Sequence, residues 1–342
     1  MKTEEGLGFT NLSPQEQQVY KAMLSAFTVH SEFVDCSNFN SKIDLSKVMH
    51  VALGDNPLIV YFNKTKMEME ESGRSRRIFF TGVCSKNEAE KISRTLDETA
   101  DTIVSSLKLS KTDEYTKLIG IYEFMQKSIK YDRDELQANA KGVSKNPFSH
   151  NAYGALINKL AVCDGFSSAF VLLAKKLGFE CMLVVGKSKY STATFIPHAW
   201  NIVKVKNRYY HMDSTWDTRK YNEFGVFSYA YFAMKDDEIR NDHDWDITAA
   251  PTCGHNDLSY YNRNGLIVIN ESQFDEALRF FNSKKTEAFR VKIFETFKLP
   301  NNAGDYFAQK FADAVAVPGV RTQISYGWNE NTRCFTGRIE KS

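Results

Sequence analysis

One stretch of the chain, residues 150–217, constrains the fold more than any other. Its middle part predicts a helix, because apolar residues recur at intervals of three and four from Phe166 to Leu177. Gly178 follows at the position where a left-handed residue commonly ends a helix. Cys163 therefore falls at or just before the first turn, where unpaired N–H groups and the helix dipole favour a thiolate.

The sequence after this helix predicts a β-hairpin that brings a histidine and an aspartate together. Its two strands, Ala199–Val205 and Arg208–Ser214, are separated by a Lys-Asn pair, and asparagine tolerates positive φ. A two-residue turn sets the register so that His198 is a diagonal neighbour of Asp213 on one face. Such neighbours lie roughly 7–8 Å apart at the backbone, within reach of an imidazole–carboxylate hydrogen bond.

Cys163, His198 and Asp213 in this arrangement are the parts of a thiol acyl-transfer site. The thiolate would attack a carbonyl, the histidine would move the proton, and the aspartate would fix the histidine tautomer and stabilise the imidazolium. Each residue also has an ordinary interpretation: a buried thiol, a structural histidine at a strand edge, and an aspartate that caps the loop from Ser214. The agreement of three separate positions favours the catalytic interpretation.

The segments NAYGALINKLAVCDGFSSAF and HAWNIVKVKNRYYHMDSTWD resemble the core of the transglutaminase-like superfamily, especially its bacterial members. The resemblance rests on three spaced blocks, Cys-x-Gly, His-Ala-Trp and Asp-x-Thr-Trp-Asp, and extends loosely back to Ile129-Lys130-Tyr131-Asp132. It implies a papain-like fold, a Cys163–His198–Asp213 triad, and peptidase, amidase or amine-transfer activity.

The resemblance also raises the question of what stabilises the oxyanion. Transglutaminases proper carry a tryptophan upstream of the cysteine for this purpose, whereas the first tryptophan of this chain is Trp200. Asn151 and Tyr153 are candidate replacements, together with the backbone N–H of Cys163. Trp200 and Trp216 are expected to pack around the site and exclude water, so all four side chains are predicted to border the substrate.

Other histidines and cysteines are predicted to have supporting roles. His211 is expected on the same face as Asp213, as a packing residue rather than a second base. His243, Cys253 and His255 match no common metal-ligand spacing, and no EF-hand loop is present. The sequence therefore predicts neither a metal nor a cofactor.

Charge and cysteine usage exclude several classes of protein. The 44 basic and 42 acidic residues give a net charge of +2, so no nucleic-acid partner is expected. No apolar run approaches the roughly 18 residues of a membrane span, and the six cysteines are widely spaced without a CxxC. A cytoplasmic protein with a peptide or protein substrate is expected, with a secreted or cell-surface origin open if the N-terminus was trimmed.

The regions before the central stretch predict a mixture of helices and strands. Ser13 and Glu16 form a capping-box pattern before a helix, and a strand is expected at 58–62. The polar stretch Glu135–Ser149 is expected to be a loop at the rim of the cleft.

From about Leu266 the pattern becomes βαβαββ, which is typical of a small α+β domain. The predicted fold class is α+β. A papain-like or transglutaminase-like catalytic core at 111–262 is flanked by an N-terminal α+β region at 1–110 and a C-terminal α+β domain at 263–342.

Three functions remain open from the sequence. The first is a cysteine hydrolase acting on peptide or isopeptide bonds, and the second is a transglutaminase that transfers a glutamine acyl group to an amine. The third is a non-enzymatic binding module on the same fold, which the intact Cys, His and Asp disfavour.

Overall fold

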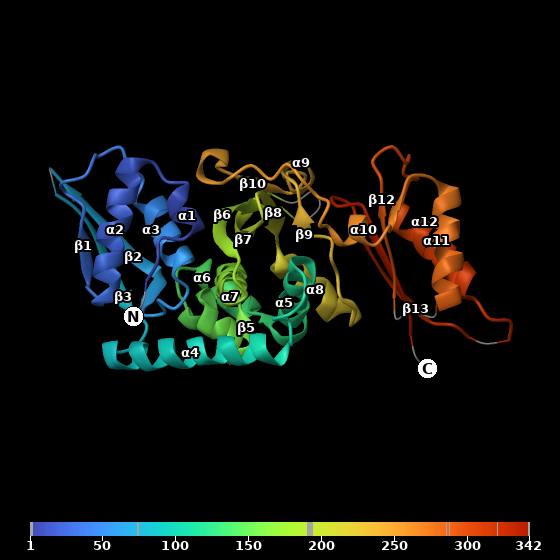
Figure 1. Cartoon of the computed structure of the whole chain (residues 1–342), viewed down its shortest axis with the longest axis horizontal. Helices are drawn as coiled ribbons and strands as arrows, with labels where there is room; N and C mark the ends of the chain where they lie inside the picture. The colour runs from blue at the N-terminus through green and yellow to red at the C-terminus, as the bar shows by residue number, and fades with distance from the viewer. Residues whose placement is uncertain are drawn as a thin grey trace.

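A computed structural model describes residues 3–73, 75–189, 194–284, 286, 288–319 and 321–340. Its elements form an N-terminal, a central and a C-terminal unit in a row, with the central unit between the other two (Figure 1). A separate hydrophobic cluster fills most of each unit. The α+β class is confirmed, whereas the domain boundaries at 110 and 262 stay a prediction.

The N-terminal unit packs helices against a small antiparallel sheet with strand order β1-β3-β2. The Ser13–Glu16 capping box at the start of α2 is confirmed. The strand expected at 58–62 is wrong, because Ile59 N–H bonds back to Asn56 O at 2.9 Å in a turn. The elements are α1 (Leu7–Thr10), α2 (Pro14–Thr28), β1 (Phe33–Asp35), α3 (Leu45–Asp55), β2 (Phe62–Ser72) and β3 (Ser75–Gly82).

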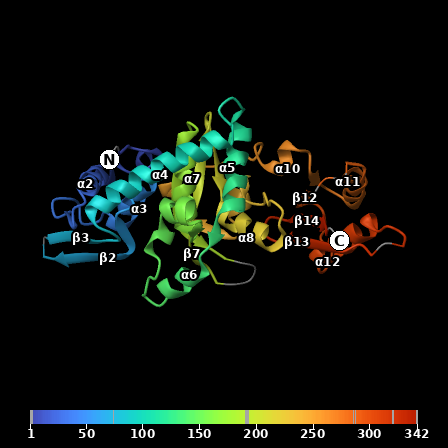
Figure 2. The same ribbon diagram turned by 90° about the horizontal axis from the view of Figure 1, so that it is seen from below.

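Helix α4 (Lys86–Ser106) joins the N-terminal and central units. Seen from below, it lies across both of them (Figure 2). Ala89 near its start belongs to the N-terminal hydrophobic cluster, whereas Leu96 and Ile103 belong to the central one. Because one helix contributes to both cores, the two units are held in a fixed relation.

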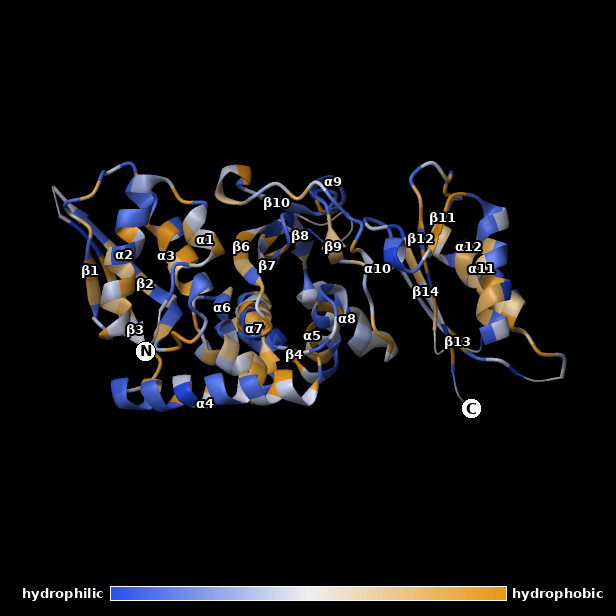
Figure 3. Ribbon diagram, viewed as in Figure 1, coloured by the Kyte–Doolittle hydropathy of each residue, from blue (hydrophilic) through white to orange (hydrophobic). Residues whose placement is uncertain are grey.

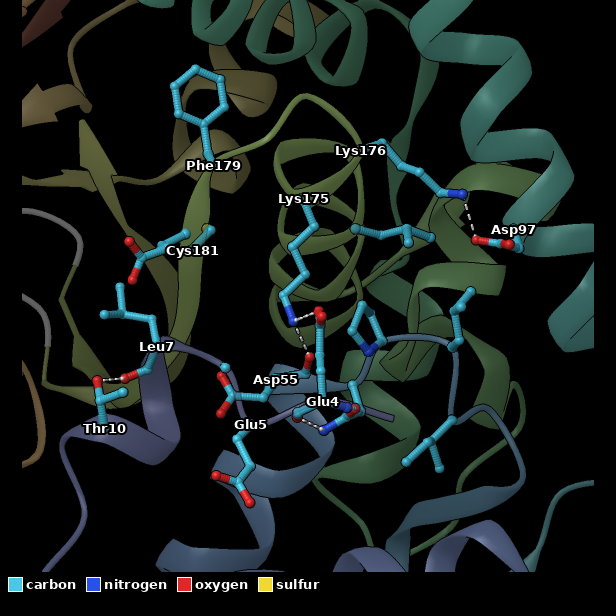
Figure 4. A pocket seen from close by; sticks show the side chains of 17 residues that line it. Glu4, Glu5, Leu7, Thr10, Asp55, Asp97, Lys175, Lys176, Phe179 and Cys181 are labelled. Atoms are coloured by element: carbon cyan, nitrogen blue, oxygen red, sulfur yellow. Dashed lines mark hydrogen bonds and ion pairs between the residues drawn. The ribbon is translucent and has the colours of Figure 1, made fainter. Parts of the chain in front are cut away.

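A cleft of about 510 Å³ lies where the N-terminal unit meets the central unit. Lys175 reaches into this junction, where its Nζ lies 2.5 Å from both Glu4 Oε1 and Asp55 O (Figure 4). The Asp55 carboxylate in turn accepts the backbone N–H groups of Gly8 and Phe9 at 3.0 and 2.8 Å. These contacts hold the C-terminal end of helix α7 (Cys163–Lys176) against the N-terminal unit. Cys163 is at the other end of α7, so this cleft lies apart from it.

The central unit packs helix α7 (Cys163–Lys176) against a five-stranded antiparallel sheet of order β10-β6-β7-β8-β9. Residues 165–174 of α7 are all buried, and apolar colour gathers on this helix at the centre of the unit (Figure 3). The strands are β6 (Glu180–Ser188), β7 (Ile196–Val205), β8 (Arg208–Met212), β9 (Phe232–Met234) and β10 (His243–Trp245). The helices around them are α5 (Glu114–Ser128), α6 (Arg133–Asn139), α8 (Ser214–Phe224), α9 (Asp236–Ile239) and α10 (Tyr260–Arg263).

Two local predictions in the central unit are corrected. The stretch Glu135–Ser149 contains most of α6 and the start of a 3-10 helix (Pro147–His150) instead of an open loop. It folds around the buried Glu135 carboxylate, which accepts the N–H groups of Lys145 and Asn146 at 2.8 and 2.6 Å. The second hairpin strand ends at Met212, because Asp213 caps α8.

The C-terminal unit has the βαβαββ order that the sequence predicts. Its sheet order is β11-β12-β14-β13, with β11 parallel to β12 and the other pairs antiparallel. The elements are β11 (Ile267–Val268), α11 (Glu271–Lys284), β12 (Phe289–Ile293), α12 (Ala303–Val315), β13 (Ile324–Asn329) and β14 (Cys334–Ile339). Among the described residues of the whole chain, no helix is both long and apolar enough to cross a membrane.

Candidate active site

Cys163 is the first residue of α7, and the segments around it hold this helix end in place. Strands β4 (Lys130–Tyr131) and β5 (Leu160–Ala161) pair in parallel just before it. Val162 N–H donates to Ser149 O at 3.0 Å. A Cβ on Gly165 would lie 2.2 Å from that same oxygen, so glycine is required there. Cys163 thus lies at the N-terminus of a 14-residue helix, as predicted, and its side chain is partly exposed.

His198 and Asp213 lie together, as the hairpin register requires. Val205 pairs with Arg208 across the two-residue turn, which confirms the predicted register. His198 Nε2 lies 2.7 Å from Asp213 Oδ2. The other Asp213 oxygen, Oδ1, accepts the N–H groups of Thr215 and Trp216 at 2.9 and 3.2 Å. Asp213 therefore contacts His198 with one carboxylate oxygen and caps α8 with the other, and its role in orienting the histidine for catalysis stays a prediction.

The electrostatics of these residues favour a charged histidine. Burial opposes the charge of His198, but the Asp213 carboxylate and the Cys163 thiol outweigh it and raise the pKa of His198 to about 9. Burial likewise opposes the charge of Asp213, yet His198 and then His243 hold its pKa well below the usual range. His198 can therefore hold a proton close to Cys163, as a general acid must.

A second histidine, His243 of β10, contacts the same carboxylate from the other side. Its Nε2 lies 3.1 Å from Asp213 Oδ2 and its Nδ1 lies 2.6 Å from Asp242 Oδ1. Tyr231 donates its hydroxyl to Asp242 at 2.5 Å, and Asn329 of the C-terminal unit donates to that hydroxyl at 3.1 Å. A continuous chain of hydrogen bonds, buried except at Asn329, thus connects the C-terminal unit to Asp213.

Replacing His243 is expected to change how stability depends on pH. Burial opposes its charge, but hydrogen bonds to Asp213 and Asp242 raise the pKa of His243 to about 9. A histidine in the unfolded chain titrates at about pH 6.5. The stability that protonated His243 gives the folded state is therefore complete below about pH 6.5 and is lost as pH rises through about 9. His243→Gln should therefore cost up to about 3–5 kcal/mol at pH 6.5 and much less above pH 9.

Melting temperatures between pH 6 and 9.5 test this expectation. His255→Gln, a change at an exposed histidine, is the matched control. An equal loss of melting temperature at every pH in His243→Gln would show that His243 does not carry the charge assigned to it.

The side chains predicted to border the substrate lie in different surroundings. Trp200 is wholly buried and stacks under His198 with ring centroids 6.0 Å apart, so it supports the histidine and is out of reach of a substrate. Asn151 is 3% exposed, and its Oδ1 accepts the N–H groups of Tyr153 and Gly154 at 3.0 and 3.4 Å. Trp216 borders a cleft beside His198, and its role in substrate binding stays a prediction.

His211 lies beneath Trp200, in the supporting position that the sequence favours. Its Nδ1 accepts the indole N–H of Trp200 at 2.9 Å, and its Nε2 lies 2.8 Å from Asp236 Oδ1. Burial lowers the pKa of His211, so the ring is neutral with its proton on Nε2. This arrangement fixes Trp200, and through it the plane of His198.

The cleft beside His198 has a volume of about 720 Å³. His198 and Trp216 lie in its wall, and exposed side chains of α6 form the rim. Three exposed cations, Lys130, Arg133 and Arg219, also line it. Of the described residues that line the cleft, none carries a carboxylate. The described lining of this cleft therefore carries positive charge without a compensating carboxylate.

Sequence reasoning missed two groups that lie beside the start of α7. Lys64 comes from the N-terminal unit and donates to Ser168 Oγ at 3.3 Å. Burial lowers its pKa, while Asp164 and Cys163 favour its charged form. His150 lies 3.0 Å from Asp164 and 3.2 Å from Glu135. Lys64 lies in the interval of β2, between Phe62 and Met67, where the register of its pairing with β3 shifts. The sequence carries no signal for that shift.

Two groups of potential metal ligands occur among the described residues. Their ligand atoms lie within 4.8 Å of one another, and the groups are His198, Asp213 and His243, and His211, Asp236 and Cys253. In the first, both nitrogens of His243 bond carboxylates. In the second, the Nε2 atom of His211 that faces Asp236 carries the proton. Hydrogen bonds therefore already use the nitrogen atoms that a metal would need.

Comparisons with known proteins find similarity in the central part of the chain. A family model described as the transglutaminase-like superfamily matches residues 101–214. The chain is 25% identical over 169 residues to a kyphoscoliosis peptidase of Homo sapiens and 24% identical over 167 residues to one of Mus musculus. Both matches cover 44% of this chain and 24% of the relative, so the chain spans about a quarter of the length of these curated relatives.

A solved structure described as a TGase has 15% sequence identity and a TM-score of 0.30, and the match covers 44% of each chain. The family resemblance predicted from the sequence is confirmed for the central part of the chain by the family model.

Proposed function

We propose that this protein is a cysteine hydrolase that cleaves peptide or isopeptide bonds through a thioester on Cys163. The observation that carries the proposal is the 2.7 Å contact of His198 Nε2 with Asp213 Oδ2, together with the position of Cys163 at the N-terminus of α7. Cys163 lies close enough to His198 to favour the charged form of the imidazole and raise its pKa. The curated relatives named as peptidases support hydrolysis as the outcome.

In the first half of the reaction, the Cys163 thiolate attacks the carbonyl carbon of the substrate. The backbone N–H of Cys163, at the positive end of α7, would stabilise the charge that develops on the carbonyl oxygen. When the C–N bond breaks, protonated His198 gives its proton to the leaving amine, so the products are a free amine and a thioester. Asp213 stabilises the imidazolium until that transfer.

In the second half, a water molecule attacks the thioester. Neutral His198 accepts a proton from this water, the C–S bond breaks, and the acyl group leaves as a carboxylic acid. The thiolate and the imidazolium are restored together. His198 thus carries the proton that is transferred in each half of the reaction, and the two transfers balance.

Water is proposed as the acceptor because the cleft disfavours an amine. An alkylamine such as putrescine is a cation at neutral pH, and Lys130, Arg133 and Arg219 would repel it. Water at ~55 M then competes well, unless the site gives the amine a large effective molarity. A transglutaminase with the same three residues is the alternative.

Product partitioning tests hydrolysis against amine transfer. A peptide amide is turned over in millimolar lysine or putrescine, and the acid and amine-adduct products are counted by mass spectrometry. We expect acid to exceed adduct at every amine concentration. Adduct in excess of acid would establish a transferase, with the assignment of the three residues unchanged.

A further inference from the structure

The cleft beside His198 differs in charge from the rest of the molecule. The whole chain is nearly balanced, with 44 basic and 42 acidic residues. Lys130, Arg133 and Arg219 line the cleft, whereas none of the described lining residues is acidic. They come from β4, from the start of α6 and from α8, so three segments separated in sequence each bring one cation to the same cleft.

The same cleft also presents exposed apolar side chains. Ile196 is 54% exposed and Leu136 is 41% exposed, although both are large aliphatic residues. They lie in the wall with Trp216 and close to His198. Exposed aliphatic side chains beside a reactive centre are stabilised when a ligand covers them. The lining therefore combines exposed apolar side chains with positive charge.

We propose that this cleft binds peptide segments that carry aspartate or glutamate beside an aliphatic residue, next to the bond that Cys163 attacks. The inference rests on the proposed function for the position of the bond, and on charge complementarity for the class of substrate. The carboxylates of the substrate would pair with Lys130 and Arg133, while its aliphatic side chain would cover Ile196 and Leu136. The anionic groups are internal side chains of the peptide, not its free C-terminus.

The first test uses Cys163 itself as a reporter of local charge. Iodoacetate is an anion, whereas iodoacetamide is neutral. The ratio of their alkylation rates at Cys163, divided by the same ratio for glutathione, therefore measures how strongly the cleft attracts an anion. The variant Lys130→Gln/Arg133→Gln/Arg219→Gln should lower this ratio on the order of tenfold at low salt, and 0.5 M NaCl should remove most of the difference. An unchanged ratio would overturn the inference.

The matched control removes the same charge elsewhere. Arg279→Gln/Lys284→Gln/Lys298→Gln changes three exposed cations of the C-terminal unit and should leave the ratio at Cys163 unaltered. If this control lowers the ratio as much as the cleft variant does, net charge rather than the cleft attracts the anion, and the inference fails.

The second test measures binding without turnover, in Cys163→Ala. Fluorescein-labelled Gly-Ala-Glu-Leu-Gln-Glu-Leu-Ala amide is compared by anisotropy with the peptide in which glutamine replaces both glutamates. We expect the acidic peptide to bind about tenfold more tightly at low salt, with the difference lost in the cleft variant. Equal binding, or a preference seen only for a peptide with a free C-terminal carboxylate, would contradict the inference.

The two proposals can fail separately. If Cys163 forms a thioester but neither test shows a preference for anions, the substrate class is wrong and the hydrolase stands. If the acidic peptide binds selectively but no thioester forms on Cys163, the cleft inference stands and the hydrolase fails.

Discussion

Replacing Asp213 by asparagine is expected to lower kcat by a factor on the order of 10⁴, as the same change does in a serine-protease triad. The amide can still bond His198, but it cannot offset the imidazolium charge and can hold the wrong tautomer. The fold should survive, because asparagine caps a helix about as well as aspartate does, and Oδ1 caps α8. Steady-state kinetics and circular dichroism on the same preparation check both parts.

The same variant should also move the pH profile in a defined direction. Burial opposes the charge of His198. Two groups raise its pKa to about 9, and the Asp213 carboxylate has a larger effect than the Cys163 thiol. Without that charge, the His198 pKa falls toward its ordinary value near ~6.5. The alkaline limb of kcat/KM should therefore shift to lower pH. The control is Asp113→Asn, which changes the aspartate that caps α5. An unchanged kcat in folded Asp213→Asn would remove Asp213 from the mechanism.

Replacing Cys163 by alanine is expected to abolish turnover, with a loss of about 10⁴-fold or more, because no other group can form the thioester. Alanine is the best helix former and the site is partly exposed, so α7 should remain intact. Cys84→Ala is the matched control, since Cys84 and Cys163 are the two of the six cysteines that are not buried. Turnover retained in Cys163→Ala would assign the activity to another group and would leave Cys163 without a catalytic role.

The parts of the site that sequence could predict are those set by local rules. The helix from Cys163 follows from apolar periodicity, and the proximity of His198 and Asp213 follows from a two-residue turn, because turn length fixes strand register. The βαβαββ order of the C-terminal unit was predictable for the same reason. Each of these inferences uses residues close together in the chain.

The parts that sequence could not predict depend on contacts between distant segments. His243 reaches Asp213 because β10 pairs with β6 at the edge of the sheet, with His243 opposite Ser188. One signal could have indicated it: His-x-Trp occurs at His198-Ala-Trp200 and again at His243-Asp-Trp245, and the two tryptophan rings pack 5.8 Å apart. Lys64 offers no comparable signal, because an irregularity in strand pairing places it.

The most direct test of the account is to trap the acyl-enzyme. The protein is mixed with p-nitrophenyl acetate, quenched in acid within the first turnover, digested and mapped by mass spectrometry. The account predicts one acetyl group per chain as a thioester on Cys163, formed in a burst that disappears in Cys163→Ala and persists in Cys84→Ala. An acetyl group on another residue, or a burst of equal size in Cys163→Ala, would contradict it.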